Sequence, residues 1–89
     1  MKIVISGIGE MGSHLARMLS GNGHDITVID SDSKALNELG NLADLITVEG
    51  DTTTFAVLRK AGVRRCDLFI AVNHDENMNI LSAIMAKQL

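Results

Sequence analysis

The chain has 89 residues, a formal net charge of −3 and 46% hydrophobic residues, so it forms one domain at most. Its eight Lys and Arg residues are scattered and its aromatic residues are two Phe alone. This excludes a nucleic-acid-binding surface, which needs a basic stripe or aromatic stacking partners. No apolar run approaches the roughly 20 residues that span a membrane, and residues 1–6 are too short for a signal peptide. We therefore expect a cytoplasmic protein.

The single cysteine, Cys66, has no second cysteine with which to form an internal disulfide, a pattern that fits a reducing compartment. We expect it to pack as a small apolar side chain. No neighbouring cysteine offers a second metal ligand, and we expect no metal site.

The first half of the chain alternates apolar runs with helical patterns. Residues 2–6 are rich in β-branched side chains and predict a buried strand. A helix follows and stops near residues 21–23, with an apolar face of Met11, Leu15, Met18 and Leu19. Residues 24–30 predict a second strand. A second helix begins at a cap, Ser31 or Asp32, packs through Leu36 and Leu39, and closes at Gly40 and Asn41.

The second half repeats this alternation. Residues 45–49 predict a third strand, and Thr53 or Thr54 caps a third helix that ends at Ala61 and Gly62. Residues 67–73 predict a fourth strand, and a last helix starts near Asp75. Strands separated by helices predict a parallel sheet, and their apolar runs indicate helices on both faces. We predict an α/β, Rossmann-like three-layer sandwich with strand order 3-2-1-4.

A glycine-rich turn, Gly7-Ile8-Gly9-Glu10-Met11-Gly12, joins the first strand to the first helix. The pattern is a weak signal alone, but its position between a strand and a helix is typical of dinucleotide-binding proteins. Gly7 then permits the tight turn, Gly9 lets the backbone approach a pyrophosphate, and Gly12 lets the helix pack on the strand. The helix start favours phosphate through its free amides and its dipole. The alternative is a turn that binds no ligand.

Asp30 ends the second predicted strand, 18 residues after Gly12. The dinucleotide fingerprint places an acid near this position, where it binds a ribose. A carboxylate there repels a 2′-phosphate, so NADP is disfavoured. The alternative role for Asp30 is a turn or a helix cap.

Read in order, these motifs resemble the N-terminal lobe of RCK (KTN) domains, as in TrkA-type subunits that regulate potassium uptake. The resemblance covers residues 1–89 and rests on the combined order of the motifs. The matching stretches are Ile8-Gly9-Glu10-Met11-Gly12, Asp25-Ile26-Thr27-Val28-Ile29-Asp30, Gly50-Asp51-Thr52-Thr53, Leu58-x-x-Ala61-Gly62, Asp67-Leu68-Phe69-Ile70-Ala71-Val72, and Asp75-Glu76 with Asn77 or Asn79.

The resemblance implies a regulatory role without catalysis. Members of this family bind NAD(H), ATP or ADP at the glycine turn, so we expect NAD(H) here, with ATP, ADP or AMP as the alternatives. They assemble as dimers and larger rings beneath a membrane ion-conducting subunit. The ligand positions implied here are Gly7, Ile8, Gly9, Glu10, Met11, Gly12, Asp30, Ser31, Asp51, Thr52 and Asn73. Asp51 would accept a hydrogen bond from the adenine amine; its alternative role is to cap the next helix.

Two features depart from the family pattern. Glu10 stands where many relatives carry Arg or Gln near the phosphates, so we expect NAD(H) to bind more tightly than ATP. The sequence also ends within the predicted fourth helix, where the lobe usually continues for two more strands. We therefore expect the fold to be truncated there.

A polar stretch, Asn73-His74-Asp75-Glu76-Asn77, precedes the last helix. The spacing of Asn73 and Glu76 predicts a capping box. Contact with the phosphate or the second ribose of a ligand is the alternative.

We therefore expect a regulatory module of a potassium transport system that binds NAD(H) or another adenine nucleotide. Ligand-dependent conformational change would gate a membrane subunit, which would hold the module at the inner face of the cell membrane. The apolar last helix, with Met78, Ile80, Leu81, Ile84 and Met85, predicts a homodimer or a larger ring. The alternative function is the cofactor-binding domain of an NAD-dependent dehydrogenase, which is disfavoured because the sequence offers no catalytic acid–base pair.

Overall fold

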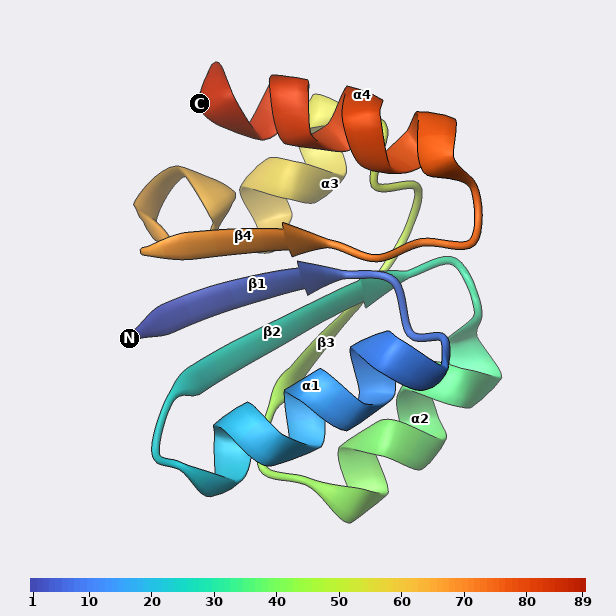
Figure 1. Ribbon diagram of the computed structural model, residues 1–89, viewed down its shortest axis with the longest axis vertical. Helices are drawn as coiled ribbons and strands as arrows, with labels where there is room; N and C mark the ends of the chain where they lie inside the picture. Colours follow the sequence, from blue (N-terminus) through green and yellow to red (C-terminus); the bar gives the residue numbers. More distant parts are fainter.

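The computed structural model describes all of residues 1–89 as an open sheet of four parallel strands between two layers of helices (Figure 1). The strand order is β3-β2-β1-β4, which confirms the predicted Rossmann-like α/β fold with order 3-2-1-4. None of the helices combines the length and the apolar character that a membrane crossing requires. The elements in chain order are β1 (Lys2–Ser6), α1 (Glu10–Gly21), β2 (Asp25–Asp30), α2 (Ser33–Leu42), β3 (Ile46–Glu49), α3 (Phe55–Lys60), the 3-10 helix η1 (Val63–Arg65), β4 (Leu68–Ala71) and α4 (Glu76–Lys87).

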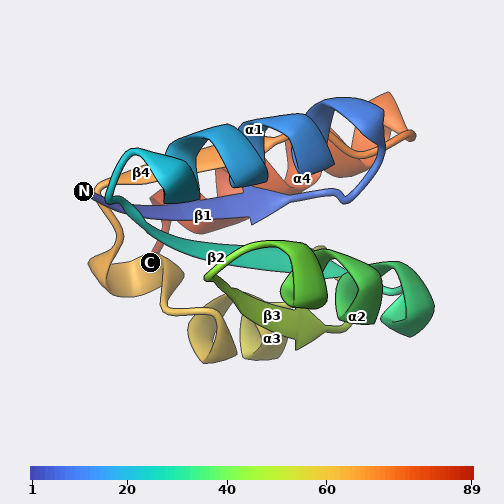
Figure 2. The ribbon, with the colours of Figure 1, turned by 90° about the horizontal axis from the view of Figure 1, so that it is seen from below.

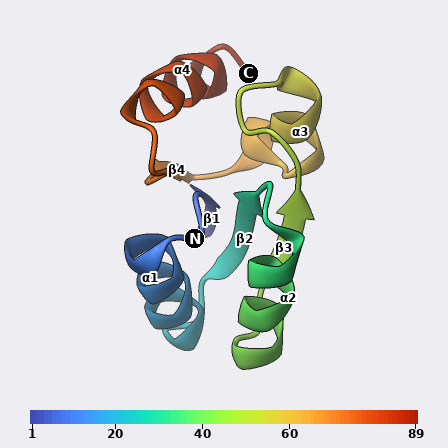
Figure 3. The same ribbon diagram turned by 90° about the vertical axis from the view of Figure 1, so that its right-hand side faces the viewer.

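Side chains alternate between the two faces of the sheet, so each central strand contributes to two cores. Ile3 and Ile5 of β1 pack with α1 and α2, whereas Val4 packs on the opposite face with Leu58 of α3. Figure 3 shows the strands between α1 and α2 on one side and α3 and α4 on the other. Because helices cover both faces, apolar side chains of the central strands are buried on both faces of the sheet.

Helix α1 packs on the sheet through small side chains, which corrects part of its predicted apolar face. Gly12 and Ala16 are buried, and Leu15 is partly buried beside them. Met11 and Met18 are instead 66% and 47% exposed. The packed face therefore includes a glycine and an alanine, which lie closest to the strands, while the two methionines project from the flank.

Helix α2 runs past its predicted end. The expectation that Gly40 and Asn41 close it is wrong, because the helix continues to Leu42 and ends at the cap residue Ala43. Gly40 does not have a positive φ, so it does not adopt the left-handed conformation that commonly ends a helix.

The strands after β1 are shorter than expected. β2 and β3 each begin one residue late, and β4 occupies only the centre of the predicted range 67–73. Main-chain hydrogen bonds nevertheless join Asp67 N to Lys2 O and Val72 N to Ser6 O. Pairing with β1 therefore extends one residue beyond each end of β4.

The carboxyl ends of the four strands meet at one edge of the sheet, and the two chain termini lie at the opposite end (Figure 2). The hydrogen bonds Gly7 N to Ile29 O and Gly50 N to Asp30 O connect the segments that leave the strands at this edge. Ligands of open α/β sheets bind outside the carboxyl ends of the strands. The polar residues predicted for the site follow the strands at this edge.

Candidate functional site

The glycines of the β1–α1 turn meet different structural demands. Gly7 has a φ of +116°, which favours glycine, and a Cβ there would lie 2.6 Å from the carbonyl oxygen of Val72. A Cβ on Gly12 would overlap the carbonyl oxygen of Gly7. The tight-turn role predicted for Gly7 and the close-packing role predicted for Gly12 thus follow from the fold itself.

Gly9 is under no such demand. Its φ of −58° is accessible to any residue, and a Cβ there would meet only the imidazole of His74, at 3.6 Å from Nε2. That separation is an ordinary van der Waals contact. Neither conformation nor packing therefore requires glycine at this position, and the space above its Cα is open.

The start of α1 carries main-chain amides without helical partners. Gly9 is the N-cap residue and offers no side chain to cap the helix. The first main-chain hydrogen bond of α1 joins Ser13 N to Gly9 O, so the amides of residues 10–12 precede the helical ladder. These amides and the positive end of the helix dipole favour an anion. The other α-helices are capped by the side chains of Asp32, Thr54 and Asp75.

Asp30 lies at the end of β2, as predicted, and its carboxylate spans two segments. Oδ2 accepts a hydrogen bond from Ile8 N at 2.9 Å, and Oδ1 accepts one from Asp32 N at 2.9 Å. The amide of Ile8 is therefore engaged by Asp30 rather than free for a phosphate. Asp32, and not Asp30 or Ser31, caps α2 by accepting from Ala35 N at 3.1 Å. Each carboxylate oxygen of Asp30 retains a further lone pair.

A pocket of about 440 Å³ lies beside Asp30 at the carboxyl edge of the sheet. Its lining includes two carboxylates and no Lys or Arg. The predicted residues of the glycine turn are outside this lining, and the bond between Asp30 and Ile8 N joins the turn to the pocket. The lining brings together the predicted site residues Asp30, Ser31, Asp51, Thr52 and Asn73, and adds Gly50, Thr53 and Met78.

Two hydrogen bonds, one buried and one partly buried, connect Asn73, Ser6 and Thr52 beside the pocket. Asn73 Nδ2 donates to Ser6 Oγ at 2.8 Å, and Ser6 Oγ donates to Thr52 Oγ1 at 2.6 Å. Ser6 and Thr52 are both buried. The hydroxyl of Thr52 therefore fixes the β3–α3 segment against the end of β1. Sequence reasoning missed Ser6, although a serine that ends an apolar strand was the available signal.

Asn73 does not form the predicted capping box. Its main-chain and side-chain amides donate to Asn79 Oδ1 at 2.6 and 2.9 Å, and Asn79 Nδ2 donates back to Asn73 O at 3.0 Å. Asp75 is the N-cap of α4 and accepts from Asn77 N at 2.8 Å. The predicted capping box is wrong because the side chain of Asn73 is hydrogen-bonded to Ser6 and Asn79 instead.

Asp51 stabilises the loop between β3 and α3. It does not cap α3, so the alternative role predicted for Asp51 is wrong. Its Oδ1 accepts from Thr53 N at 2.8 Å and from Thr53 Oγ1 at 2.6 Å. Both bonds lower the pKa of the exposed Asp51 carboxyl, and the bond from the Thr53 side chain has the larger effect. Thr54 is the residue that caps α3. Asp51 lines the pocket, and its Oδ2 makes no hydrogen bond within the chain.

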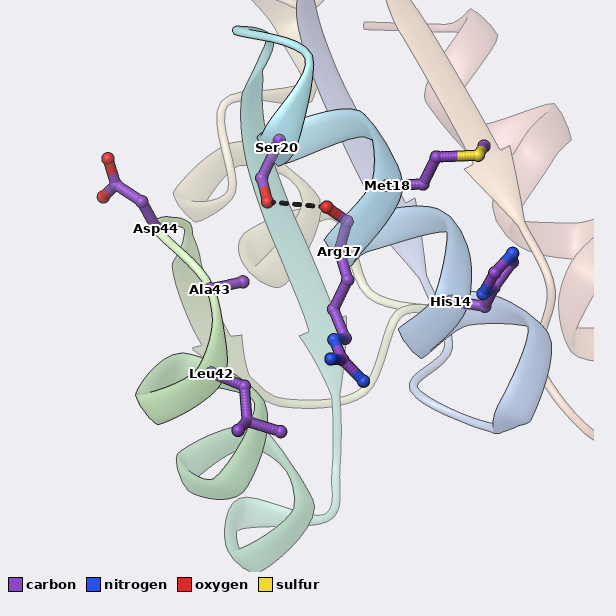
Figure 4. Close-up of a pocket in the computed structure, with 8 residues that line it drawn as sticks. His14, Arg17, Met18, Ser20, Leu42, Ala43 and Asp44 are labelled. Atoms are coloured by element: carbon purple, nitrogen blue, oxygen red, sulfur yellow. Dashed lines mark hydrogen bonds between the residues drawn. The ribbon is translucent and has the colours of Figure 1, made fainter.

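A second hollow, of about 600 Å³, lies between the C-terminal parts of α1 and α2. Figure 4 shows Arg17 between the two helices, whereas His14 and Met18 point away from Leu42. Ser20 Oγ donates to Arg17 O at 3.2 Å. No predicted site residue lines this hollow.

The remaining candidate groups are structural. Cys66 is partly buried against the core formed with α3 and α4, as expected, and this burial raises the pKa of its thiol. No three His, Cys, Asp or Glu side chains are grouped in a way that would hold a metal ion.

The chain is similar along its whole length to potassium uptake proteins. The model of the TrkA-N domain family matches residues 3–89. A Trk system potassium uptake protein TrkA homolog of Archaeoglobus fulgidus is 40% identical over 89 residues, which are 100% of this chain and 20% of the relative. The homolog of Pyrococcus abyssi is 36% identical, with 100% and 39% covered. The TrkA protein of Halomonas elongata is 39% identical, with 100% and 20% covered. The chain thus spans well under half the length of these relatives.

A solved structure shares the fold. The Shewanella denitrificans Kef CTD in its AMP-bound form superimposes with a TM-score of 0.83 at 19% sequence identity, covering 99% of this chain and 52% of the other.

Proposed function

This chain belongs to the TrkA-N domain family, and we propose that it is a regulatory module that binds NAD(H) or a related adenine nucleotide. In the whole protein, ligand binding at this site would be coupled to the state of a membrane potassium-transport subunit. The names of the relatives support the transport context. The AMP-bound form of the Kef CTD supports an adenine nucleotide as the ligand of this fold.

The proposed ligand crosses from the pocket to the glycine turn. Asp30 accepts hydrogen bonds from the ribose hydroxyls through the lone pairs that Ile8 and Asp32 leave free. Asp51 Oδ2 accepts from the adenine amine, and Met78 supplies apolar contact in the same lining. The pyrophosphate lies over Gly9 and accepts from the amides of residues 10–12.

Gly9 is the observation that carries this proposal. Folding requires glycine at Gly7 and Gly12, whereas at Gly9 neither φ nor packing requires it, and the N-cap position favours glycine no more than Ser, Thr, Asn or Asp. A close approach of phosphate to the backbone supplies a reason for glycine there. The uncapped amides beside it provide the hydrogen-bond donors that a phosphate needs.

The test compares Gly9→Ala with Gly21→Ala by calorimetry with NADH. A Cβ at Gly21 meets nothing within 4 Å, so Gly21→Ala is a matched control at the other end of α1. Both variants should remain folded at 25 °C, although Gly9→Ala replaces a favourable N-cap residue at a cost of roughly 0.5–1 kcal/mol and Gly21→Ala gains helix propensity. Gly9→Ala should lose about tenfold or more in affinity, whereas Gly21→Ala should not change. Wild-type affinity in Gly9→Ala would contradict the proposed site.

The regulatory part of the proposal has its own requirement. A nucleotide changes the state of the transport system only if it binds two conformations with different affinity. The chain spans 20% to 39% of the relatives named above, so this coupling belongs to the whole protein. In that protein, Gly9→Ala should remove the effect of NADH on potassium uptake without removing uptake itself.

A further inference from the structure

We propose that His74 is a specificity residue for the phosphate part of the ligand and makes nucleotide binding dependent on pH. This inference rests on the proposed function, because it assigns a contact within that nucleotide site. Its imidazole would donate a hydrogen bond to the phosphates that lie over Gly9.

The placement of the His74 ring carries the inference. Nε2 lies 3.6 Å and Cε1 lies 3.7 Å from the position that a Cβ on Gly9 would occupy. His74 is exposed in the segment between β4 and α4. A phosphate seated on the backbone at Gly9 would therefore lie beside this ring and within reach of its nitrogen.

The backbone on both sides of His74 is held in place. Asn73 is bonded to Ser6 and by three hydrogen bonds to Asn79. Asp75 caps α4 by accepting from Asn77 N. The segment that carries His74 is thus anchored at its two neighbours, which keeps the imidazole close to the glycine turn.

The charges around the site leave this role to His74. Asp30 and Asp51 line the pocket with no Lys or Arg, and Glu10 follows Gly9 directly. A pyrophosphate brings further negative charge into this acidic region. The charged and titratable residues of the elements beside the imidazole are Glu10, His14 and Arg17 on α1, Asp75 at the N-cap of α4, and Glu76 and Lys87 on α4. Of the groups that can carry positive charge, the imidazole of His74 is the one that lies within 4 Å of the position that a Cβ on Gly9 would occupy.

A proton dependence follows from the chemistry of the ring. Histidine is the side chain whose charge ordinarily changes between pH 5 and 8. The imidazolium donates a charge-assisted hydrogen bond to a phosphate oxygen, which is stronger than a neutral one. Affinity for a nucleotide with phosphate should therefore rise as the pH falls, whereas affinity for adenosine should not.

The experiment measures NAD and adenosine binding by calorimetry at pH 6 and pH 8. NAD is preferred to AMP because phosphate monoesters themselves titrate near pH 6. The proteins are the wild type, His74→Gln, and the matched control His14→Gln on α1. We expect wild type and His14→Gln to bind NAD more tightly at pH 6. His74→Gln should lose about tenfold at pH 6, the size of one charge-assisted hydrogen bond, and should lose the pH dependence, with adenosine binding unchanged.

The outcomes separate the two proposals. If wild type binds NAD and His74→Gln matches it at both pH values, the role of His74 is overturned and the nucleotide site stands. An equal loss of adenosine affinity in His74→Gln would also overturn it, because the contact would then not be with phosphate. If wild type binds neither ligand at either pH, the nucleotide site itself is overturned.

Discussion

Asp30 shows how one side chain serves the fold and the proposed site together. Its two oxygens accept from Ile8 N and Asp32 N, so the carboxylate fixes the glycine turn against the end of β2. The same bonds orient the carboxylate beside the pocket. A ribose would meet an acceptor that is already in place, which limits the side-chain entropy lost on binding.

We expect Asp30→Ala to weaken NAD binding by about 1.5–3 kcal/mol, the range for a hydrogen bond to a charged group. The substitution also leaves Ile8 N without its acceptor and lowers stability, so affinity must be measured where the variant is folded. Asp32→Ala is the matched control, because it removes the cap of α2 and costs about 1 kcal/mol of stability. Its NAD affinity should not change. Calorimetry that finds wild-type affinity in Asp30→Ala would exclude the ribose contact.

The sequence predicts residues whose role depends on local conformation better than those whose role depends on distant contacts. The roles of Gly7 and Gly12 follow from the strand–turn–helix pattern, and the structure shows the close contacts that require them. The proximity of His74 to Gly9 and the bonds of Ser6 to Thr52 and Asn73 join segments that are far apart in the chain, 46 residues for Thr52 and 67 for Asn73. No spacing rule along the sequence indicates contacts of that kind.

At the scale of elements, Asn79 ties helix α4 to the end of β4. Its side-chain amide pairs with both the main chain and the side chain of Asn73. Asn73 in turn bonds to Ser6 at the end of β1. The position of α4 is thus linked by hydrogen bonds to the pocket lining that Asn73 shares.

Asn79→Ala should therefore destabilise the protein. The substitution leaves partly buried polar groups of Asn73 without partners, which costs about 1–3 kcal/mol for an unsatisfied group. Asn77→Ala is the matched control, because Asn77 is exposed in the same helix and its side chain makes no hydrogen bond. Urea unfolding measures both free energies. Equal stability of the two variants would contradict the structural role of Asn79.

The order of elements was predictable because apolar periodicity and turn residues agree along the chain. The ends of the helices and strands were harder to predict. The spacing of Asn73 and Glu76 fits a capping box, yet Asp75 is the residue that caps α4. Several polar residues near a helix start can each satisfy the local rule, and tertiary bonds decide between them. In α2, packing likewise carries the helix through Gly40.

At the scale of the whole molecule, α4 presents an apolar face that the chain does not cover. Ile80, Leu81 and Ile84 are 56%, 47% and 52% exposed. Exposed apolar patches often mark protein–protein contacts. The remaining predicted residues, Met78 and Met85, are partly buried against the molecule itself.

We expect this face to form a homodimer that is detectable by sedimentation at tens of micromolar. Ile84→Glu should shift the protein towards the monomer, because it places a charge within an apolar contact. Leu42→Glu changes a similarly exposed residue at the end of α2 and should leave the dimer intact. A wild-type monomer at this concentration would count against the assembly.

The expected preference for NAD(H) over ATP follows from the charge of the site as a whole. Glu10 is exposed beside the glycine turn, and Asp30 and Asp51 line the pocket. Two like charges about 4 Å apart repel by roughly 1 kcal/mol in water and about 4 kcal/mol at an effective dielectric constant of 20. A triphosphate ends in such a charge, whereas the nicotinamide half of NAD(H) ends in a ribose and a ring.

Calorimetric titration of the unmodified protein with NADH, and then with ATP, is the direct test of the proposed nucleotide site. We expect saturable binding of one NADH per chain, with a lower Kd than ATP. Glu10→Arg should shift this balance towards ATP. Tighter binding of ATP than of NADH by the unmodified protein would contradict the assignment of Glu10. The absence of saturable binding of any adenine nucleotide would contradict the proposed nucleotide site itself.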